Sequence, residues 1–212
     1  MENPKSICFI LLSLIFTAGR ALDHAERVSA PRVRPIDASQ WTEVHRKALG
    51  SYAANGEVPS NNSLATCARN PELCRSWLTF ASYIEGNTST LSRRDRAIIM
   101  LRTAWLCGED YHWGYGVRSA ERAGMSRDEI LRIAKASEQQ GWSASDVLLL
   151  RAIDELHKDQ FISDATWKGL TQTYDERQLL DVVFTVGQYT MVSMFHNSAG
   201  VQREPGIAGL PR

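Results

Sequence analysis

Residues 91–124 read LSRRDRAIIMLRTAWLCGEDYHWGYGVRSAERAG, and this stretch decides the fold. Ser92 is a good helix N-cap, and an apolar helical run follows over residues 97–106. Gly108 then interrupts the pattern. A second helical pattern continues to Gly124, a residue type that commonly ends helices. The stretch therefore predicts two helices joined by a short turn.

The turn between these two helices gathers reactive side chains. A thiol, a carboxylate, a phenol, an imidazole and an indole occur there as Cys107, Glu109, Tyr111, His112 and Trp113. If the second helix starts near Glu109, then Glu109, His112 and Gly116 fall close to one helical face. A carboxylate one turn from an imidazole suits general acid–base catalysis, and Gly116 would leave space for a substrate. The alternative interpretation is a surface Glu–His pair at a helix end.

The rest of the chain repeats the helical pattern. Capping residues and apolar spacing of three and four predict further helices, at 40–54, 63–68, 71–85, 126–139, 143–156, 164–174 and from 175 onward. The last helix is apolar on most faces, so we expect it to be buried or to lie at a subunit interface. No period-two pattern indicates a strand. The sequence predicts an all-α fold with a single domain.

Composition narrows the function classes. The 212 residues carry 24 basic and 24 acidic side chains, whereas nucleic-acid binders usually show a basic excess or stripe. We therefore expect no nucleic-acid partner.

The N-terminus has the features of a secretory signal peptide. Lys5 precedes an apolar run at 7–18, and the small residues Gly19 and Ala21 suit cleavage after Ala21. An uncleaved membrane anchor is the competing interpretation, but the run is short for a bilayer span. We expect residues 1–21 to be a signal peptide, 22–38 a flexible arm and 39–212 the helical domain. The mature protein would then be periplasmic or secreted and would not be a membrane protein.

Export affects how the cysteines are interpreted. Cys67 and Cys74 flank a turn at Asn70 and Pro71 that could bring their thiols together, and an oxidising compartment favours disulfides. We predict a Cys67–Cys74 disulfide, with two unpaired cysteines as the alternative. Cys107 would then be the odd thiol, and a buried, inert cysteine is the simplest interpretation of it.

Basic residues near the central turn could hold an anionic substrate. A cluster of arginines begins the first central helix, and Arg102 and Arg118 are further candidates to bind a carboxylate. His196, at the end of the apolar last helix, is either a core or interface residue or part of the binding site. The chain contains no HExxH, CxxC or glycine-rich phosphate loop, so we predict neither a metal nor a cofactor.

Three segments resemble the carboxymuconolactone decarboxylase family, whose wider superfamily includes alkylhydroperoxidase D. They are ARNPELCRSWLTF (68–80), residues 91–126 and GQYTMVSMFHNSAGVQREPG (187–206). The resemblance implies an all-helical bundle that assembles into homo-oligomers, commonly trimers or hexamers, with sites near subunit interfaces.

The resemblance also separates two kinds of chemistry. The peroxidase branch carries a Glu, a CxxC motif and a His, and these positions correspond here to Ala97, Glu109, His112 and Gly116. The non-redox branch carries an EYEW-like pattern, which is closer to residues 109–113. The comparison therefore implies proton transfer rather than a dithiol cycle, with His112 replacing an imidazole that the family places one turn later.

Together these features predict a cofactor-free lyase or isomerase that acts on a small carboxylated or lactone-like molecule. His112 would be the general acid or base, Glu109 would orient it, and Tyr111 would donate to an oxyanion. The predicted binding residues are Arg102, Arg118, Trp113 and His196. A non-enzymatic ligand-binding oligomer is one alternative, and a thiol-dependent antioxidant enzyme that uses Cys107 is another.

Overall fold

The computed structural model describes residues 28–56, 61–135 and 141–211, so the predicted signal peptide lies outside the described residues and stays a prediction. The described chain is all-helical, which confirms the predicted class. Its α-helices are α1 (Glu43–Leu49), α2 (Asn62–Cys67), α3 (Pro71–Glu85), α4 (Arg93–Leu106), α5 (Asp110–Arg122), α6 (Arg127–Ile133), α7 (Ala144–Asp159), α8 (Asp164–Leu170) and α9 (Glu176–Ala199).

Several predicted helix starts are confirmed by the capping contacts. Ser92, Ser126, Ser143 and Asp175 each accept a hydrogen bond from a backbone amide in the first turn of the following helix. The first helix differs from the prediction. It begins after Thr42, ends at Leu49 and continues as a 3-10 segment, because Gly50 adopts a positive φ of 52° that an α-helix does not allow.

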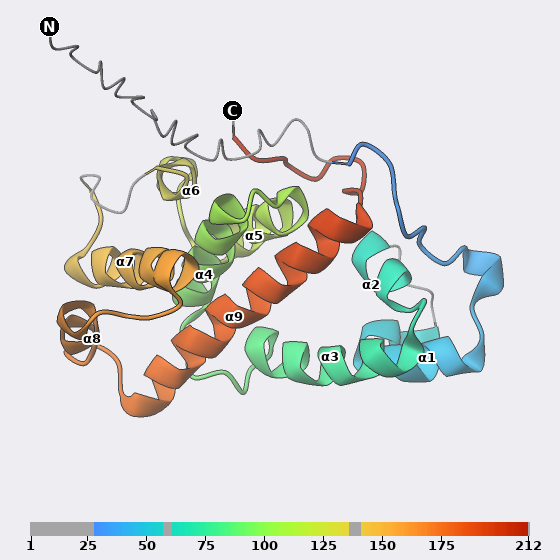
Figure 1. The fold of residues 1–212 in the computed structure, drawn as a ribbon, viewed down its shortest axis with the longest axis horizontal. Helices are drawn as coiled ribbons and strands as arrows, with labels where there is room; N and C mark the ends of the chain where they lie inside the picture. Colours follow the sequence, from blue (N-terminus) through green and yellow to red (C-terminus); the bar gives the residue numbers. More distant parts are fainter. Residues whose placement is uncertain (1–27, 57–60, 136–140, 212) are drawn as a thin grey trace, which may run out of the picture.

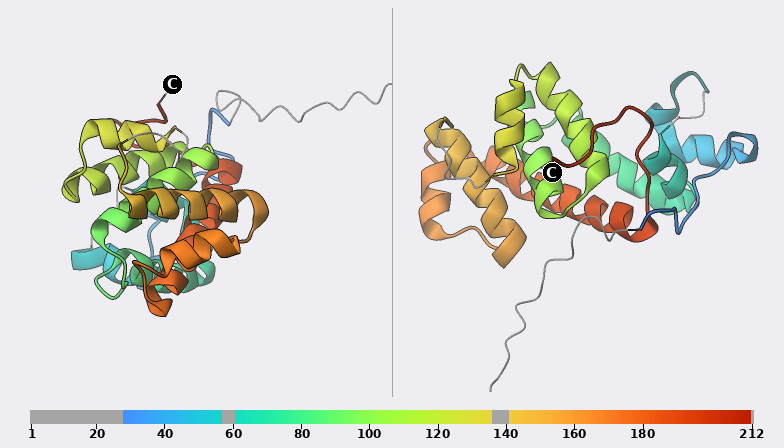
Figure 2. Two further views of the ribbon diagram at one scale, coloured as in Figure 1. Left: turned by 90° about the vertical axis from the view of Figure 1, so that its left-hand side faces the viewer. Right: turned by 90° about the horizontal axis from the view of Figure 1, so that it is seen from above.

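The longest described helix, α9, runs along the length of the molecule (Figures 1 and 2). The helices α7 and α8 lie at one end, and α1, α2 and α3 lie at the other. The helix α4 packs against α5, α7 and α9 and forms the centre of the larger core. A smaller core around Trp41, Leu49 and Leu78 joins α1, α2 and α3.

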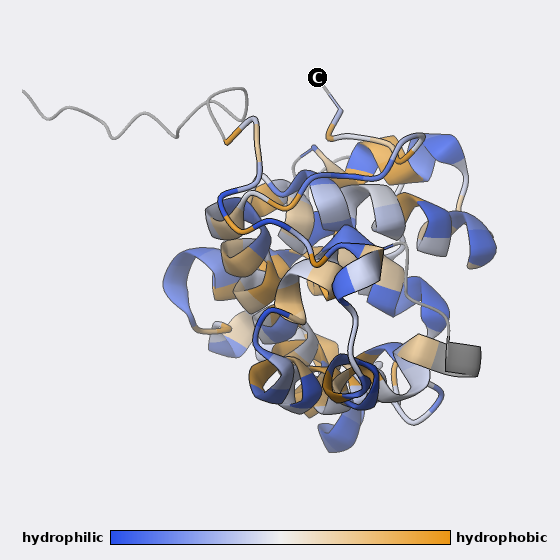
Figure 3. Cartoon of the chain, turned by 90° about the vertical axis from the view of Figure 1, so that its right-hand side faces the viewer, coloured by the Kyte–Doolittle hydropathy of each residue, from blue (hydrophilic) through white to orange (hydrophobic). Residues whose placement is uncertain are grey.

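Hydrophobic residues concentrate on helix faces that turn toward the interior (Figure 3). Every residue from Ala97 to Ala104 of α4 is buried, including Arg102. The Arg102 guanidinium donates to both carboxylate oxygens of Asp154, at 2.6 and 3.0 Å, and to the carbonyl of Ile133. A buried arginine with this many partners is a structural element of the core.

The segment predicted as an arm lies against the helices over its described part. The amides of Arg32 and Val33 donate to the carbonyl of Ala199, and the amide of Ile36 donates to that of Ala65. Residues 32–36 therefore connect the end of α9 with α2. In the described part of the chain, no helix has the length and apolar character that a membrane span requires.

The predicted Cys67–Cys74 disulfide is wrong. The turn between α2 and α3 does bring the two side chains together, but both remain free thiols. A hydrogen bond to Cys74, together with burial, raises the pKa of the Cys67 thiol. The pair therefore contributes to the smaller core as two adjacent thiols.

Glycines of α5 allow close packing rather than an open space. A Cβ at Gly116 would lie 2.8 Å from a methyl carbon of Leu101, so the space expected there for a substrate is filled by α4. At Gly114, a Cβ would collide with Ile207 and would lie 2.5 Å from the carbonyl oxygen of Ala208. The C-terminal segment thus lies directly on α5.

We expect Gly114→Ala to lower the free energy of unfolding by about 1–3 kcal/mol, because a methyl group there displaces the C-terminal segment. The matched control is Gly187→Ala on α9, where an added Cβ meets nothing within 4 Å. That change should raise stability by up to about 1 kcal/mol through helix propensity. Urea denaturation of both variants checks the prediction, and equal effects would contradict it.

Candidate functional site

The candidate site is organised around the carboxylate of Glu109, which is only 1 % exposed. Gly108, at φ 57°, turns the chain out of α4 and leaves Glu109 as the N-cap of α5. One carboxylate oxygen accepts the amide of Tyr111 at 2.7 Å, and the other accepts the amide of His112 at 2.8 Å. Capping therefore fixes the carboxylate at the positive end of a helix.

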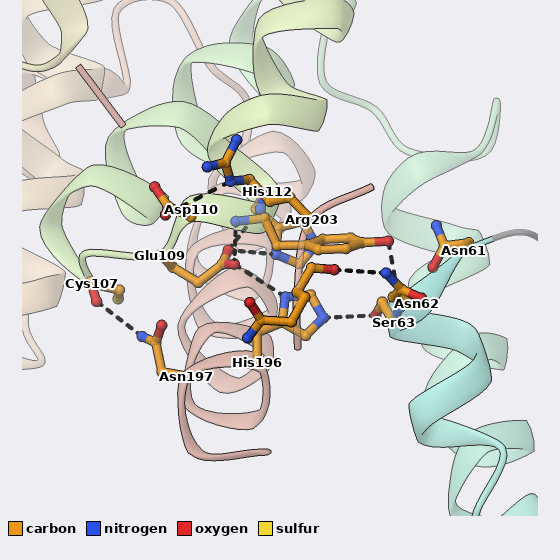
Figure 4. A network of polar contacts seen from close by, with 12 residues as sticks. Asn61, Asn62, Ser63, Cys107, Glu109, Asp110, His112, His196, Asn197 and Arg203 are labelled. Carbon is orange, nitrogen blue, oxygen red and sulfur yellow. Dashed lines mark hydrogen bonds and ion pairs between the residues drawn. The ribbon is translucent and has the colours of Figure 1, made fainter. Parts of the chain in front are cut away.

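Two imidazoles share this carboxylate (Figure 4). His112 Nδ1 lies 3.0 Å from Glu109 Oε2, and His196 Nδ1 lies 3.3 Å from Glu109 Oε1. The rings stack with centroids 4.7 Å apart at 16°. An ionised carboxylate only accepts hydrogen bonds, so each Nδ1 carries a proton and each Nε2 is the nitrogen left for other partners.

A second layer of contacts connects this cluster to α2 and to the C-terminal segment. His196 Nε2 lies 2.6 Å from Ser63 Oγ. The Tyr111 and Tyr115 hydroxyls donate to the two carboxylate oxygens of Glu204, at 2.9 and 3.0 Å. The Asn62 amide donates to Glu204 as well, at 2.7 Å. Four separate parts of the chain thus meet here.

The surroundings set the protonation states. Burial acts to raise the pKa of Glu109, but the charge and hydrogen bonds of His112 and His196 outweigh it and lower that pKa well below its usual range. Burial lowers the pKa of His196, only partly opposed by its hydrogen bond to Glu109. Near neutral pH, Glu109 is therefore ionised and His196 is neutral.

Glu109, His112 and His196 each offer a ligand atom within 4.8 Å of the others, a separation that a metal ion could bridge. However, both Nδ1 atoms already donate to Glu109, and the rings lie nearly parallel. Two stacked rings cannot direct in-plane lone pairs at one ion without turning. The arrangement therefore fits a hydrogen-bonded cluster better than a metal centre.

A cavity of about 490 Å³ lies against His112. Its wall includes Tyr111, Tyr115 and Tyr189, and its charged residues are Glu85, Arg93, Arg96 and Arg122. Burial raises the pKa of Glu85, although its side chain is open to the cavity and the charges of His112 and Arg96 oppose the shift. Among the described residues of this wall, three cationic side chains against one carboxyl group favour an anionic ligand.

A second cavity, of about 540 Å³, lies on the other side of the cluster. Glu109, His196 and Glu204 contribute to its wall, together with the C-terminal segment. Tyr111 lines both cavities, so the cluster forms the partition between them.

The structure brings together four of the predicted site residues, namely Glu109, Tyr111, His112 and His196. It does not bring Arg102 there, because that guanidinium is bound to Asp154 in the core. Trp113 is buried against Trp105, with ring centroids 6.1 Å apart. Arg118 is exposed and lies 6.0 Å from the centroid of the Tyr115 ring.

Sequence reasoning missed Ser63, Tyr115 and Glu204. They come from three separate parts of the chain that only folding unites, since Ser63 is on α2, Tyr115 is on α5 and Glu204 is in the C-terminal segment. The cluster at residues 93–96 did indicate a place for an anion, and Arg93 and Arg96 line the cavity. Arg94 turns away and binds Glu129 and Asp146 at 2.7 and 3.1 Å.

Residues 71–155 match the model of the carboxymuconolactone decarboxylase family. Over these residues, the chain is similar to that family. The match extends from the first residue of α3 into α7, so it includes the Glu109–His112 pair. Comparison with curated protein sequences gave no significant match.

Solved structures share the fold of this chain at low sequence identity. An uncharacterized peroxidase-related protein from Ralstonia eutropha JMP134, with an alkylhydroperoxidase AhpD core, is 13 % identical with a TM-score of 0.69, covering 82 % of this chain and 93 % of that one. A peroxidase-related protein from Silicibacter sp. TM1040 is 12 % identical with a TM-score of 0.69, covering 85 % and 96 %. The debrominase Bmp8 in complex with 2,3,4-tribromopyrrole is 16 % identical with a TM-score of 0.63, covering 82 % and 91 %.

We expect the protein to lose stability as the pH falls below about 6.5, because the unfolded state protonates its histidine there while buried His196 resists protonation. Below about pH 4.3 the depressed pKa of Glu109 adds to the loss, since the unfolded state takes up that proton first. Urea denaturation at several pH values checks this. His196→Gln should flatten the slope between about pH 5 and 7, and an unchanged slope would contradict the assignment.

Proposed function

We propose that this protein is a cofactor-free lyase or isomerase acting on a small anionic molecule, with His112 as general acid–base. One observation carries the proposal: the Nδ1 of His112 is held by buried Glu109 while its ring lines a cavity with three arginines. The match of residues 71–155 to the carboxymuconolactone decarboxylase family and the likeness to a debrominase support an enzyme that acts on small molecules.

The proposed mechanism follows from the two nitrogens of one ring. Glu109 accepts the Nδ1 proton and holds the ring in place, so Nε2 exchanges a proton with a molecule in the cavity. Arg93, Arg96 and Arg122 would bind a substrate carboxylate and fix its position. In a decarboxylation, loss of carbon dioxide leaves a carbanion or enolate, and protonated His112 would deliver a proton to that carbon.

Leu64, Leu78 and Met100 form an apolar part of the cavity wall, which would exclude water from the reacting carbon on that side. The Tyr111 hydroxyl donates a hydrogen bond to Glu204. Burial, together with Tyr115 and Glu204, raises the pKa of Tyr111. The phenol therefore stays protonated. A substrate oxyanion could take this hydrogen bond from Glu204.

Thiol chemistry has less support. Cys107 contributes to the wall of neither cavity described above, and its Sγ lies 3.8 Å from His157 Nδ1 on α7. The two CxxC positions of the peroxidase branch are the Glu109 and His112 that form the proposed acid–base pair. Proton transfer uses the residues that are present at these positions.

We expect His112→Gln to reduce kcat by about 10²–10⁴-fold, because glutamine keeps a polar side chain but cannot transfer the proton. Loss of ultraviolet absorbance from γ-carboxymuconolactone is the first assay, and other small carboxylated lactones follow. The matched control is His157→Gln, which changes a histidine outside the cavity and should leave kcat unchanged. Full activity of His112→Gln would contradict the proposal.

We also propose that the protein is a homo-oligomer that uses the exposed face of α9. The solvent-facing stripe of that helix is itself apolar, with Leu180, Phe184, Met191 and Met194 between 47 and 65 % exposed. Phe80 of α3 extends the stripe, since its ring lies 6.1 Å from that of Phe184. An apolar surface of this kind is typical of a subunit interface.

We expect Phe184→Glu to lower the molecular mass measured by size exclusion with light scattering, because a charge in the stripe opposes its burial. Phe161→Glu is the matched control, since Phe161 is 62 % exposed but lies between α7 and α8. The control should keep the mass of the unchanged protein. A monomeric wild-type protein would refute the oligomer proposal.

A further inference from the structure

Ser63 has the surroundings of a nucleophile, and the acid–base function proposed above does not use it. It lies on α2, is 5 % exposed, and still contributes to the wall of the arginine-bearing cavity. Its hydroxyl lies 2.6 Å from His196 Nε2, and His196 Nδ1 lies 3.3 Å from the Glu109 carboxylate. Figure 4 shows Ser63, His196 and Glu109 in this order, with dashed lines joining each to the next.

We propose that Ser63, His196 and Glu109 form a nucleophile–base–carboxylate relay that hydrolyses small esters or lactones. A hydroxyl, an imidazole and a carboxylate joined in this order are the arrangement by which enzymes activate serine. The three residues come from α2, α9 and the start of α5.

The hydrogen-bond pattern sets the direction of proton transfer. Glu109 accepts from Nδ1, so neutral His196 presents a lone pair at Nε2, and the Ser63 hydroxyl donates to it. Burial, which lowers the pKa of His196, keeps the ring neutral and able to take the serine proton. The charge that forms on His196 during attack would be stabilised by Glu109.

The cavity restricts the substrate class. Ser63 and the three arginines line the same cavity of about 490 Å³. The Tyr111 hydroxyl lies 3.4 Å from the Ser63 amide nitrogen, so a phenol lies next to the proposed point of attack. A small ester or lactone that also carries a carboxylate fits these surroundings.

The reaction balances with water as the second substrate. Ser63 Oγ bonds to the carbonyl carbon as its proton moves to His196 Nε2. The ester C–O bond then breaks, and the leaving oxygen takes the proton from His196, which leaves an acyl group on Ser63. A water molecule gives a proton to His196 Nε2 as its oxygen attacks the acyl carbon. The bond between that carbon and Ser63 Oγ then breaks, Oγ takes the proton back from His196, and the acid is released.

This inference stands apart from the proposed lyase or isomerase function. That function uses Nε2 of His112, whereas the relay uses Nε2 of His196. Glu109 is the residue that both share. Ser63→Ala should therefore remove ester hydrolysis and leave proton transfer at His112, and His112→Gln should have the opposite effect.

The test uses a small alkyl fluorophosphonate, which forms a phosphorus–oxygen bond with activated serine and releases fluoride. We expect peptide mapping by mass spectrometry to locate the label at Ser63 in the folded protein and not in urea-denatured protein. His196→Gln should slow labelling at least about 100-fold. Ser119→Ala is the matched control, because Ser119 lines the same cavity from α5, and it should label at the wild-type rate.

Hydrolysis of p-nitrophenyl acetate should depend on the same residues as the labelling, and mass spectrometry should find an acetyl group on Ser63 during turnover. Ser63→Cys provides a second variant with a side chain of similar size. Iodoacetamide should alkylate the cysteine of this single variant faster than that of the double variant Ser63→Cys with His196→Gln. Two results would overturn the inference: absence of label at Ser63 in folded wild-type protein, or equal labelling of Ser63 in wild-type and His196→Gln proteins. Labelling at Ser63 without lactone decarboxylation would refute only the lyase proposal.

Discussion

The buried Glu109 carboxylate is the interaction on which the site depends. Moving a carboxylate out of water is costly unless its oxygens are satisfied. Here two backbone amides of α5 and two imidazole Nδ1 groups provide four partners. Because one imidazole belongs to α5 and the other to α9, the need to satisfy one charge fixes the two helices relative to each other.

A second carboxylate completes the frame. Glu204, in the C-terminal segment, accepts from the Asn62 amide and from the Tyr111 and Tyr115 hydroxyls. Its segment is held on α5 by the close approach of Ile207 to Gly114. Glu109 and Glu204 thus anchor α5, α9 and α2 from opposite sides of Tyr111. Because protein donors satisfy both carboxylates, the aromatic rings that contact them have little freedom to move.

The sequence predicted what is local in the chain. Ser92 and Asp175 mark helix starts because a cap and its partner lie within one turn. The sequence also predicts the pairing of Glu109 with His112, because these two residues are three positions apart. The contacts of Ser63 with His196 span 133 positions and have no local signal. The sequence predicts Arg102 as a substrate-binding residue, because an arginine near a reactive turn suits an anion. Its partner Asp154, 52 positions later, shows it to be a core residue. The prediction of an open space at Gly116 is wrong for a similar reason, since the Leu101 side chain that fills the space belongs to α4.

Sharing one carboxylate between two imidazoles links the two proposed activities. Burial and the charge of His112 both lower the pKa of His196, so a proton on His112 disfavours a proton on His196. The His112 and His196 rings stack with their centroids 4.7 Å apart. The single negative charge of Glu109 can balance only one positive charge on this pair. Proton transfer at His112 and activation of Ser63 through His196 would then exclude each other at any moment. Because Glu109 also has to balance the charge that forms on His196 during attack, a proton on His112 would oppose attack by Ser63, and a neutral His112 would favour it. The protonation state of His112 would therefore decide which of the two proposed reactions the shared cavity favours.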